Sequence, residues 1–150
     1  KKNNLNFKLG ILHEDEEFTP RAFLLAEKVV YSGCMFYHYV LRDNSITNKQ
    51  DQVKNAIDLF NTCYQLEKIY EKVKEPYLRA LLRDSLSYKY LDRFQRSKFY
   101  KKKYQKYINK QFVLRNAYFK KTKLKALLFY FNTKLYYFIN KLVKNFSKTL

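Results

Sequence analysis

Glycine is almost absent from this chain, and long uncharged stretches are absent from its last segment. Only Gly10 and Gly33 occur in 150 residues. A P-loop or a dinucleotide-binding loop needs several glycines at fixed spacing, so neither motif can be built here. In the segment from Lys123 onward, the longest charge-free run is 126–133. This run is far shorter than the roughly 20 apolar residues that span a bilayer.

Histidine and cysteine are also scarce. The histidines are His13 and His38, and the cysteines are Cys34 and Cys63. Their spacing does not match that of a zinc site. Both cysteines lie in apolar surroundings, so we expect two reduced, buried thiols in a cytoplasmic protein.

Acidic residues are missing from the C-terminal part of the chain, where none follows Asp92. The net charge is +18, and residues 1–50, with 7 Lys/Arg and 6 Asp/Glu, contribute almost none of it. This asymmetry indicates an anionic partner for residues 51–150, such as phospholipid, nucleic acid or a phosphorylated substrate.

The remaining composition is that of a folded protein. Hydrophobic residues make up 47% of the chain and aromatic residues 19%, which argues against disorder. The length suits a single domain with a substantial core. A site-like motif arrives within the first fifteen residues and the chain starts at Lys1, so we expect it to be a piece of a longer protein.

The first third of the chain has α/β character. Residues 5–12 predict a short apolar strand, and Thr19 and Pro20 predict a helix start, with Thr as the cap and Pro at the first helical position. This helix is expected to run through Lys28. The β-branched and aromatic residues of 29–40 then predict one strand, or two strands broken at a turn.

The rest of the chain predicts helices. Apolar residues keep helical spacing over 49–74, and Pro76 begins a second apolar-faced helix. Residues 93–122 stay helical in propensity, although Lys, Arg and Tyr dominate them. Residues 123–150 form an amphipathic pattern. The predicted fold class is therefore mainly α with a short α/β opening.

Four consecutive carboxylates, Glu14 to Glu17, precede the first predicted helix. They repel one another, so ordinary stability does not require them. One interpretation is a strand end that delivers a carboxylate to a cleft. The other is favourable negative charge near a helix N-terminus.

Three segments occur in a distinctive order: GILHEDEEF (10–18), KVVY (28–31) and YHYVLRDNSIT (37–47). Together they resemble the C-terminal part of a family 2 glycosyltransferase, one of the bacterial GT-A enzymes of capsule, O-antigen and exopolysaccharide synthesis. The resemblance covers about residues 5–48. It implies that 1–48 is the C-terminal end of a GT-A catalytic domain and that 49–150 is a basic helical region with a C-terminal amphipathic helix.

The resemblance implies roles for five residues. Asp15 is the general base that takes the proton of an acceptor hydroxyl as its oxygen attacks a nucleotide-sugar. Glu14 orients the acceptor or supports the loop. His13 contacts the acceptor or the leaving diphosphate, and Arg42 and Ser45 close over the phosphates of the donor. The alternatives are that His13 has no role and that Arg42 and Ser45 are ordinary turn residues.

The family's nucleotide-binding half has no counterpart in this sequence. There is no Asp-x-Asp motif to hold a divalent metal, so no cofactor is expected in this chain, and Mg or Mn is expected in the full enzyme. The resemblance implies a nucleotide-sugar and a sugar acceptor as partners of the full enzyme. The isolated chain is predicted to be inactive. The implied location is cytoplasmic, peripheral on the inner face of the cell membrane.

Residues 49–150 contain no motif of their own, and three interpretations stay open. Their basic, aromatic-rich helices suit an anionic membrane surface. Their alternation of Lys and Tyr suits nucleic acid, although no recognised module is present and this partner is less favoured. The third alternative is a solvated cationic bundle whose apolar stripe, within 124–146, packs inside or forms a homo-oligomer.

Overall fold

A computed structural model of the chain describes residues 3–35, 38, 40 and 52–146. Over these residues the fold is mainly α, as the sequence predicts. The helices are α1 (Glu14–Leu25), α3 (Gln52–Tyr70), α4 (Pro76–Arg96), the 3-10 helix η1 (Lys102–Tyr107), α5 (Lys110–Asn116), α6 (Lys120–Phe131) and α7 (Thr133–Phe146).

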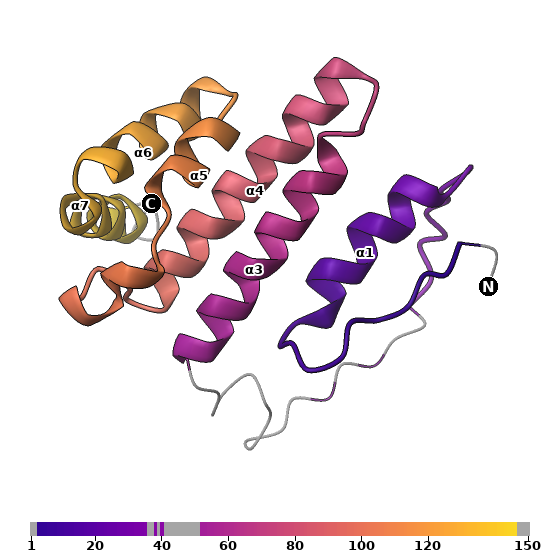
Figure 1. Ribbon diagram of the computed structural model, residues 1–150, viewed down its shortest axis with the longest axis horizontal. Helices are drawn as coiled ribbons and strands as arrows, with labels where there is room; N and C mark the ends of the chain where they lie inside the picture. The colour runs from indigo at the N-terminus through magenta and orange to yellow at the C-terminus, as the bar shows by residue number, and fades with distance from the viewer. Residues whose placement is uncertain (1–2, 36–37, 39, 41–51, 147–150) are drawn as a thin grey trace.

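Helices α3 and α4 form a long antiparallel pair through the middle of the molecule (Figure 1). Helix α1 packs on the side of α3 that faces away from α4. On the opposite side of the pair, α5 packs on α4, α6 packs on α5 and α4, and α7 packs on α6. Helices α1 and α7 therefore lie at opposite ends of the molecule (Figure 1).

The predicted strands are wrong over the described residues. Residues 5–12 form an irregular segment, and Gly10 turns it through the left-handed region with a φ of 79°. A strand needs a neighbouring strand to pair its backbone groups, and the described residues supply none. Phe7 instead stacks on Phe18 of α1, with ring centroids 4.0 Å apart. Residues 29–35 are not a strand either, and residues 36, 37 and 39 lie outside the described part.

The first helix begins earlier than predicted. Helix α1 starts at Glu14, so Thr19 is not its cap and Pro20 lies inside it. Pro20 has no N–H to offer the carbonyl of Glu16, which normally weakens a helix interior. The acidic residues of the first turn offset this loss because negative charge is favourable near a helix N-terminus.

The second predicted helix start is confirmed. Helix α4 begins at Pro76, and the Glu75 side chain caps it by accepting hydrogen bonds from the N–H groups of Tyr77 and Leu78. The preceding helix is shorter than the predicted 49–74, since α3 ends at Tyr70.

The basic C-terminal half is more broken than predicted. Residues 93–122 contain the end of α4, then η1, α5 and the start of α6, with a left-handed turn at Lys98. Residues 123–150 are not one helix, because the chain breaks at Asn132. The Asn132 carboxamide oxygen accepts from the N–H groups of Lys134 and Leu135 and so starts α7.

The cysteine prediction is half right. Cys63 is a buried thiol on α3, and burial is the main cause that raises its pKa to about 12. Cys34 is exposed and therefore does not belong to the core, contrary to the prediction.

Aromatic rings fill the core between the helices. Tyr90 of α4 is completely buried and stacks on Phe60 of α3, with centroids 3.9 Å apart. It also contacts Phe112 of α5 and Phe129 of α6. One side chain therefore joins four helices.

The Tyr90 hydroxyl also binds a backbone N–H group just before α5. It accepts a hydrogen bond from the Asn109 N–H at 2.9 Å, and burial raises the pKa of Tyr90 far above its usual value. Tyr90→Phe keeps the ring but removes the acceptor of this partly buried N–H, so we expect a loss of about 1 kcal/mol in the free energy of unfolding, measured by urea denaturation. Tyr64→Phe is the matched control, because within the described part of the chain the Tyr64 hydroxyl has a hydrogen-bond partner only in the Tyr90 hydroxyl, at 3.4 Å. Equal losses in the two variants would contradict this role of Tyr90.

Candidate functional site

The predicted catalytic residues lie at the N-terminus of α1, where it packs against α3. His13 occupies the position before the helix with a φ of 59°. Its Nε2 lies 2.9 Å from the Nδ2 atom of Asn55 on α3. A histidine in the left-handed region is uncommon, and this contact with α3 holds the turn in place.

The four consecutive carboxylates separate into two pairs with different surroundings. Glu16 forms an ion pair with Lys89 of α4, and the buried Glu17 pairs with Arg21 at 2.8 Å. Glu14 and Asp15 are exposed, and neither side chain forms a hydrogen bond or an ion pair with a described residue. Glu16 and Glu17 therefore hold the helix, while Glu14 and Asp15 remain available to a ligand.

The structure brings together three of the five predicted site residues. His13, Glu14 and Asp15 are consecutive and share the first turn of α1. Arg42 and Ser45 lie outside the described residues. Asp15 lines neither the cavity beside η1 and α5 nor the groove between α6 and α7. Across residues 3–35, 38, 40 and 52–146, no three His, Cys, Asp or Glu side chains come together in a group that could hold a metal ion.

A buried ion cluster on the other side of α3 was not predicted from the sequence. Glu67, only 6% exposed, accepts hydrogen bonds from Arg115 at 2.8 and 2.7 Å, from Asn116 at 2.7 Å and from Arg83 at 3.3 Å. Burial alone would raise the pKa of Glu67, but these hydrogen bonds and the two guanidinium charges outweigh it and lower the pKa. The cluster ties α3 to α4 and α5 and is structural.

The sequence did carry a signal for this cluster. Glu67 lies four residues after Cys63 and three before Tyr70, and both of those side chains are buried. This spacing places Glu67 on the buried stripe of its helix. A charge on such a stripe needs partners, which indicates a buried ion pair.

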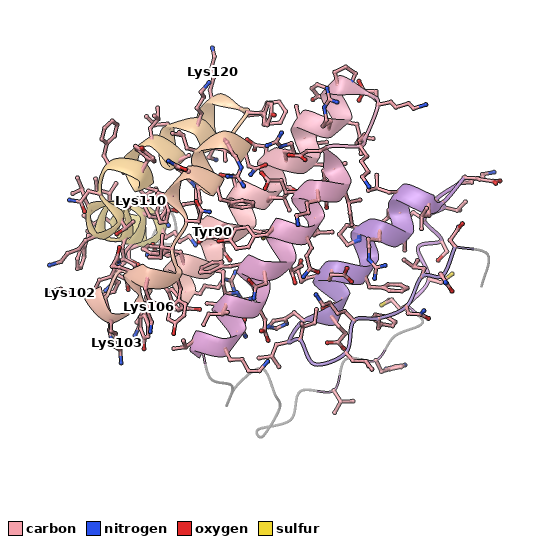
Figure 2. The ribbon with its side chains drawn as sticks, in the orientation of Figure 1. Tyr90, Lys102, Lys103, Lys106, Lys110 and Lys120 are labelled. Carbon is pink, nitrogen blue, oxygen red and sulfur yellow. The ribbon has the colours of Figure 1, made fainter. Side chains whose placement is uncertain are left out.

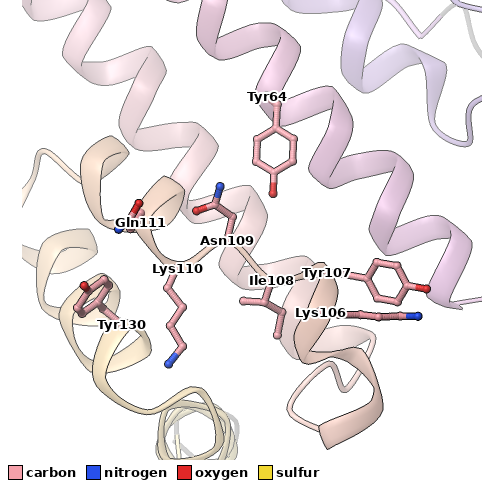
Figure 3. Close-up of a pocket in the computed structure, with 8 residues that line it drawn as sticks. All are labelled: Tyr64, Lys106, Tyr107, Ile108, Asn109, Lys110, Gln111 and Tyr130. Carbon is pink, nitrogen blue, oxygen red and sulfur yellow. The ribbon is translucent and has the colours of Figure 1, made fainter.

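A cavity of about 690 Å³ lies where η1 and α5 meet α3 and α6 (Figure 3). Two lysines and three tyrosines line it, and none of the described carboxylates does, so its chemistry suits an anionic or hydroxyl-rich molecule. Lys106 and Tyr107 in this lining belong to the segment 98–107, in which Lys and Tyr alternate. Its lining residues are Tyr64, Lys106, Tyr107, Ile108, Asn109, Lys110, Gln111 and Tyr130.

Helices α6 and α7 expose an apolar surface. A groove of about 190 Å³ runs between them, lined largely by aliphatic side chains. Aliphatic residues at neighbouring helical positions on α7 extend it. We define the α6–α7 face as Leu124, Leu128, Leu135, Ile139, Leu142 and Val143.

The apolar stripe of the last segment does not pack inside the protein as one alternative predicted. Leu124 and Phe131 on α6 and Leu135 and Leu142 on α7 are all exposed. The buried side chains of Tyr136 and Asn140 on α7 lie beside this stripe and also line the groove, and Tyr136 packs against Phe94 of α4 and Phe129 of α6. Among the described residues, no helix has the length and apolar character needed to cross a membrane.

Positive charge crowds around these two helices. Lys125 lies near the C-terminal part of α4, with its ammonium 5.9 Å from the centre of the Tyr88 ring. Burial and the positive charges of Lys121 and Lys144 lower the pKa of Lys125, and Asp92 opposes them. Such crowding favours an anionic partner, which would relieve the repulsion.

Comparison of the chain with protein-family models, with curated proteins and with solved structures finds no match. The family resemblance therefore rests on the three segments of residues 10–47 alone. The structural features that bear on function are the geometry of α1 and the surface of the helical half.

Proposed function

We propose that this chain is the C-terminal part of a family 2 glycosyltransferase that moves a sugar from a nucleotide-sugar to an acceptor hydroxyl in cell-surface polysaccharide synthesis. One observation carries the proposal beyond the sequence resemblance. Of four adjacent carboxylates, Glu16 and Glu17 form ion pairs, whereas the Glu14 and Asp15 side chains are exposed and pair with no residue that the structure describes.

The proposed chemistry is proton transfer from the acceptor. Asp15 accepts the proton of the acceptor hydroxyl while that oxygen bonds to the anomeric carbon, and the nucleoside diphosphate leaves. Glu14 orients the acceptor. The Nε2 atom of His13 faces Asn55, which leaves Nδ1 for the acceptor or the leaving diphosphate. Arg42 and Ser45 keep their proposed role at the donor phosphates.

The first turn of α1 is well suited to hold a base in position. His13 contacts α3, Glu16 pairs with Lys89 of α4, and Glu17 pairs with Arg21 within the helix. These contacts flank Asp15 on both sides in the sequence. A base must be held within hydrogen-bond reach of the attacking oxygen, and a turn fixed at three points meets that requirement.

The divalent cation expected in the full enzyme does not fit the described residues, since they form no group of three candidate ligands. It would be held by an Asp-x-Asp motif in the rest of the catalytic domain. We therefore assign no step of the reaction to a metal in this chain.

The test compares two polypeptides. The reading frame extended upstream should encode an apolar strand followed by Asp-x-Asp, and the extended polypeptide should release nucleoside diphosphate from a nucleotide-sugar when an acceptor is added. The 150-residue chain alone should not. Transfer by the isolated chain would refute its assignment as a fragment. An extended polypeptide that is inactive with a panel of nucleotide-sugars would refute the enzyme.

A second candidate function is a basic helical module that docks on an anionic membrane and holds the protein at the inner face of the cell membrane. The observation in its favour is the exposed α6–α7 face within a half that has no acidic residue after Asp92. Nucleic acid would suit the charge and the exposed rings of Phe131 and Phe138 nearby, but not the aliphatic residues that make up this face. The two candidates are compatible, because an enzyme can act while bound to a membrane.

A further inference from the structure

We infer that the α6–α7 face is the surface by which the chain binds an anionic phospholipid membrane. The inference rests on the membrane-docking part of the proposed function, names the surface and the partner, and does not depend on the sugar-transfer part.

The first evidence is the orientation of α7. Leu135, Ile139 and Leu142 follow the helical repeat and lie on one side of the helix. Leu135 is 48% exposed and Leu142 is 57% exposed, whereas Tyr136 is 2% exposed. The strongly aliphatic side of this amphipathic helix therefore faces out of the protein. In a helix that only stabilised the bundle, that side would face in.

The second evidence is that α6 continues the same surface. Leu124, which is 72% exposed, and Leu128 line the groove together with Ile139 and Val143 of α7. Two helices thus present one contiguous aliphatic area. An interfacial helix buries such an area at the boundary between the headgroups and the acyl chains.

The third evidence is charge. Lys121 and Lys123 on α6 and Lys134 and Lys141 on α7 are exposed. The same end of the molecule carries Lys102, Lys103, Lys106, Lys110 and Lys120 (Figure 2). No acidic residue occurs anywhere on α6 or α7. An anionic membrane attracts each such lysine, and the attraction adds to that of the apolar contact.

Other occupants fit less well. A second copy would use the same face in a two-fold arrangement and would bring the same lysines against each other. The rest of the proposed catalytic domain would adjoin α1, which packs on α3 at the opposite end of the molecule from α7 (Figure 1). Anionic lipid is the occupant that complements both the aliphatic residues and the lysines.

The test is co-sedimentation of the 150-residue chain with sucrose-loaded vesicles of phosphatidylcholine alone or mixed with phosphatidylglycerol. We expect binding to the mixed vesicles that weakens at high salt. Leu135→Gln/Leu142→Gln removes exposed apolar surface without changing the charge, and should weaken binding about tenfold or more. Lys134→Gln/Lys141→Gln should weaken it about fivefold per lysine.

The matched control is Leu78→Gln/Leu81→Gln, which replaces two exposed leucines of α4 that are 38% and 47% exposed. It should bind as the unchanged chain does. Circular dichroism checks that each variant is folded. Absence of binding at low salt would refute the inference, as would equal binding by the α7 and α4 leucine variants. A dimer of the unchanged chain that the α7 leucine variant loses would refute it in favour of a second copy. The assay contains no sugar donor, so its outcome is independent of the proposed transferase activity.

Discussion

In the extended enzyme, Asp15→Asn is expected to lower the rate of sugar transfer by roughly 10²–10⁴-fold, the usual contribution of a positioned general base. Asparagine has nearly the same shape as aspartate, but its carboxamide cannot take the proton of the acceptor hydroxyl. The measurement is kcat/KM from the release of nucleoside diphosphate at a fixed acceptor concentration. The loss should appear mainly in kcat, because the base acts in the transition state.

The fold should survive this substitution. The Asp15 carboxylate is exposed and pairs with no described residue, so the variant loses only its favourable charge at the start of α1. That charge contributes about 0.3–1 kcal/mol. Glu27→Gln is the matched control, since it removes another exposed carboxylate just beyond the same helix and should transfer at the unchanged rate. If Asp15→Asn retained most of the activity, the base would have to be another residue.

The helical half was predictable because periodicity and capping are local properties. Pro76 after Glu75 specified a helix start correctly, and the apolar spacing of 49–74 located α3. The strand predicted over residues 5–12 is wrong because an apolar run becomes a strand only where another strand pairs with it. Here Phe7 found a ring partner on α1 instead.

The candidate site was predictable in position but not in detail. The acidic segment is visible in the sequence, yet the partner of Glu16 is Lys89, 73 residues away. Only the folded chain shows that the Glu16 and Glu17 side chains form ion pairs, whereas the Glu14 and Asp15 side chains form none with a described residue.

The orientation of the last helix depends in the same way on distant contacts. An amphipathic pattern alone leaves open whether the aliphatic side of 133–146 turns inward or toward a partner. The break at Asn132 places Tyr136 and Tyr137 toward the core, where Tyr136 meets Phe94 and Phe129 and Tyr137 meets Tyr100. Aromatic contacts made with three other segments thus decide which side of α7 is left for a partner.

The largest expected loss of stability is that of Glu67→Gln, about 3 kcal/mol in the free energy of unfolding at neutral pH. The variant leaves Arg83, whose side chain is 15% exposed, and Arg115 without the carboxylate that both contact. Half of the Arg115 side chain reaches water, which places the loss near the low end of the range for broken buried pairs. The melting temperature should fall by roughly 6–12 °C. Urea and thermal denaturation followed by circular dichroism measure both quantities.

The pH dependence of stability distinguishes the buried ion cluster of Glu67 from an ion pair on the surface. Because the folded pKa of Glu67 is lowered, its contribution is fully present above the unfolded value of about 4.3 and is lost as the pH falls through the folded pKa. The stability curves of the unchanged chain and Glu67→Gln should therefore converge on acidification. Asp92→Asn is the control: it breaks pairs with Arg96 and Lys144, which are largely exposed, and should cost less than about 1 kcal/mol. Equal losses for the two variants would mean that the buried cluster contributes no more than surface charge.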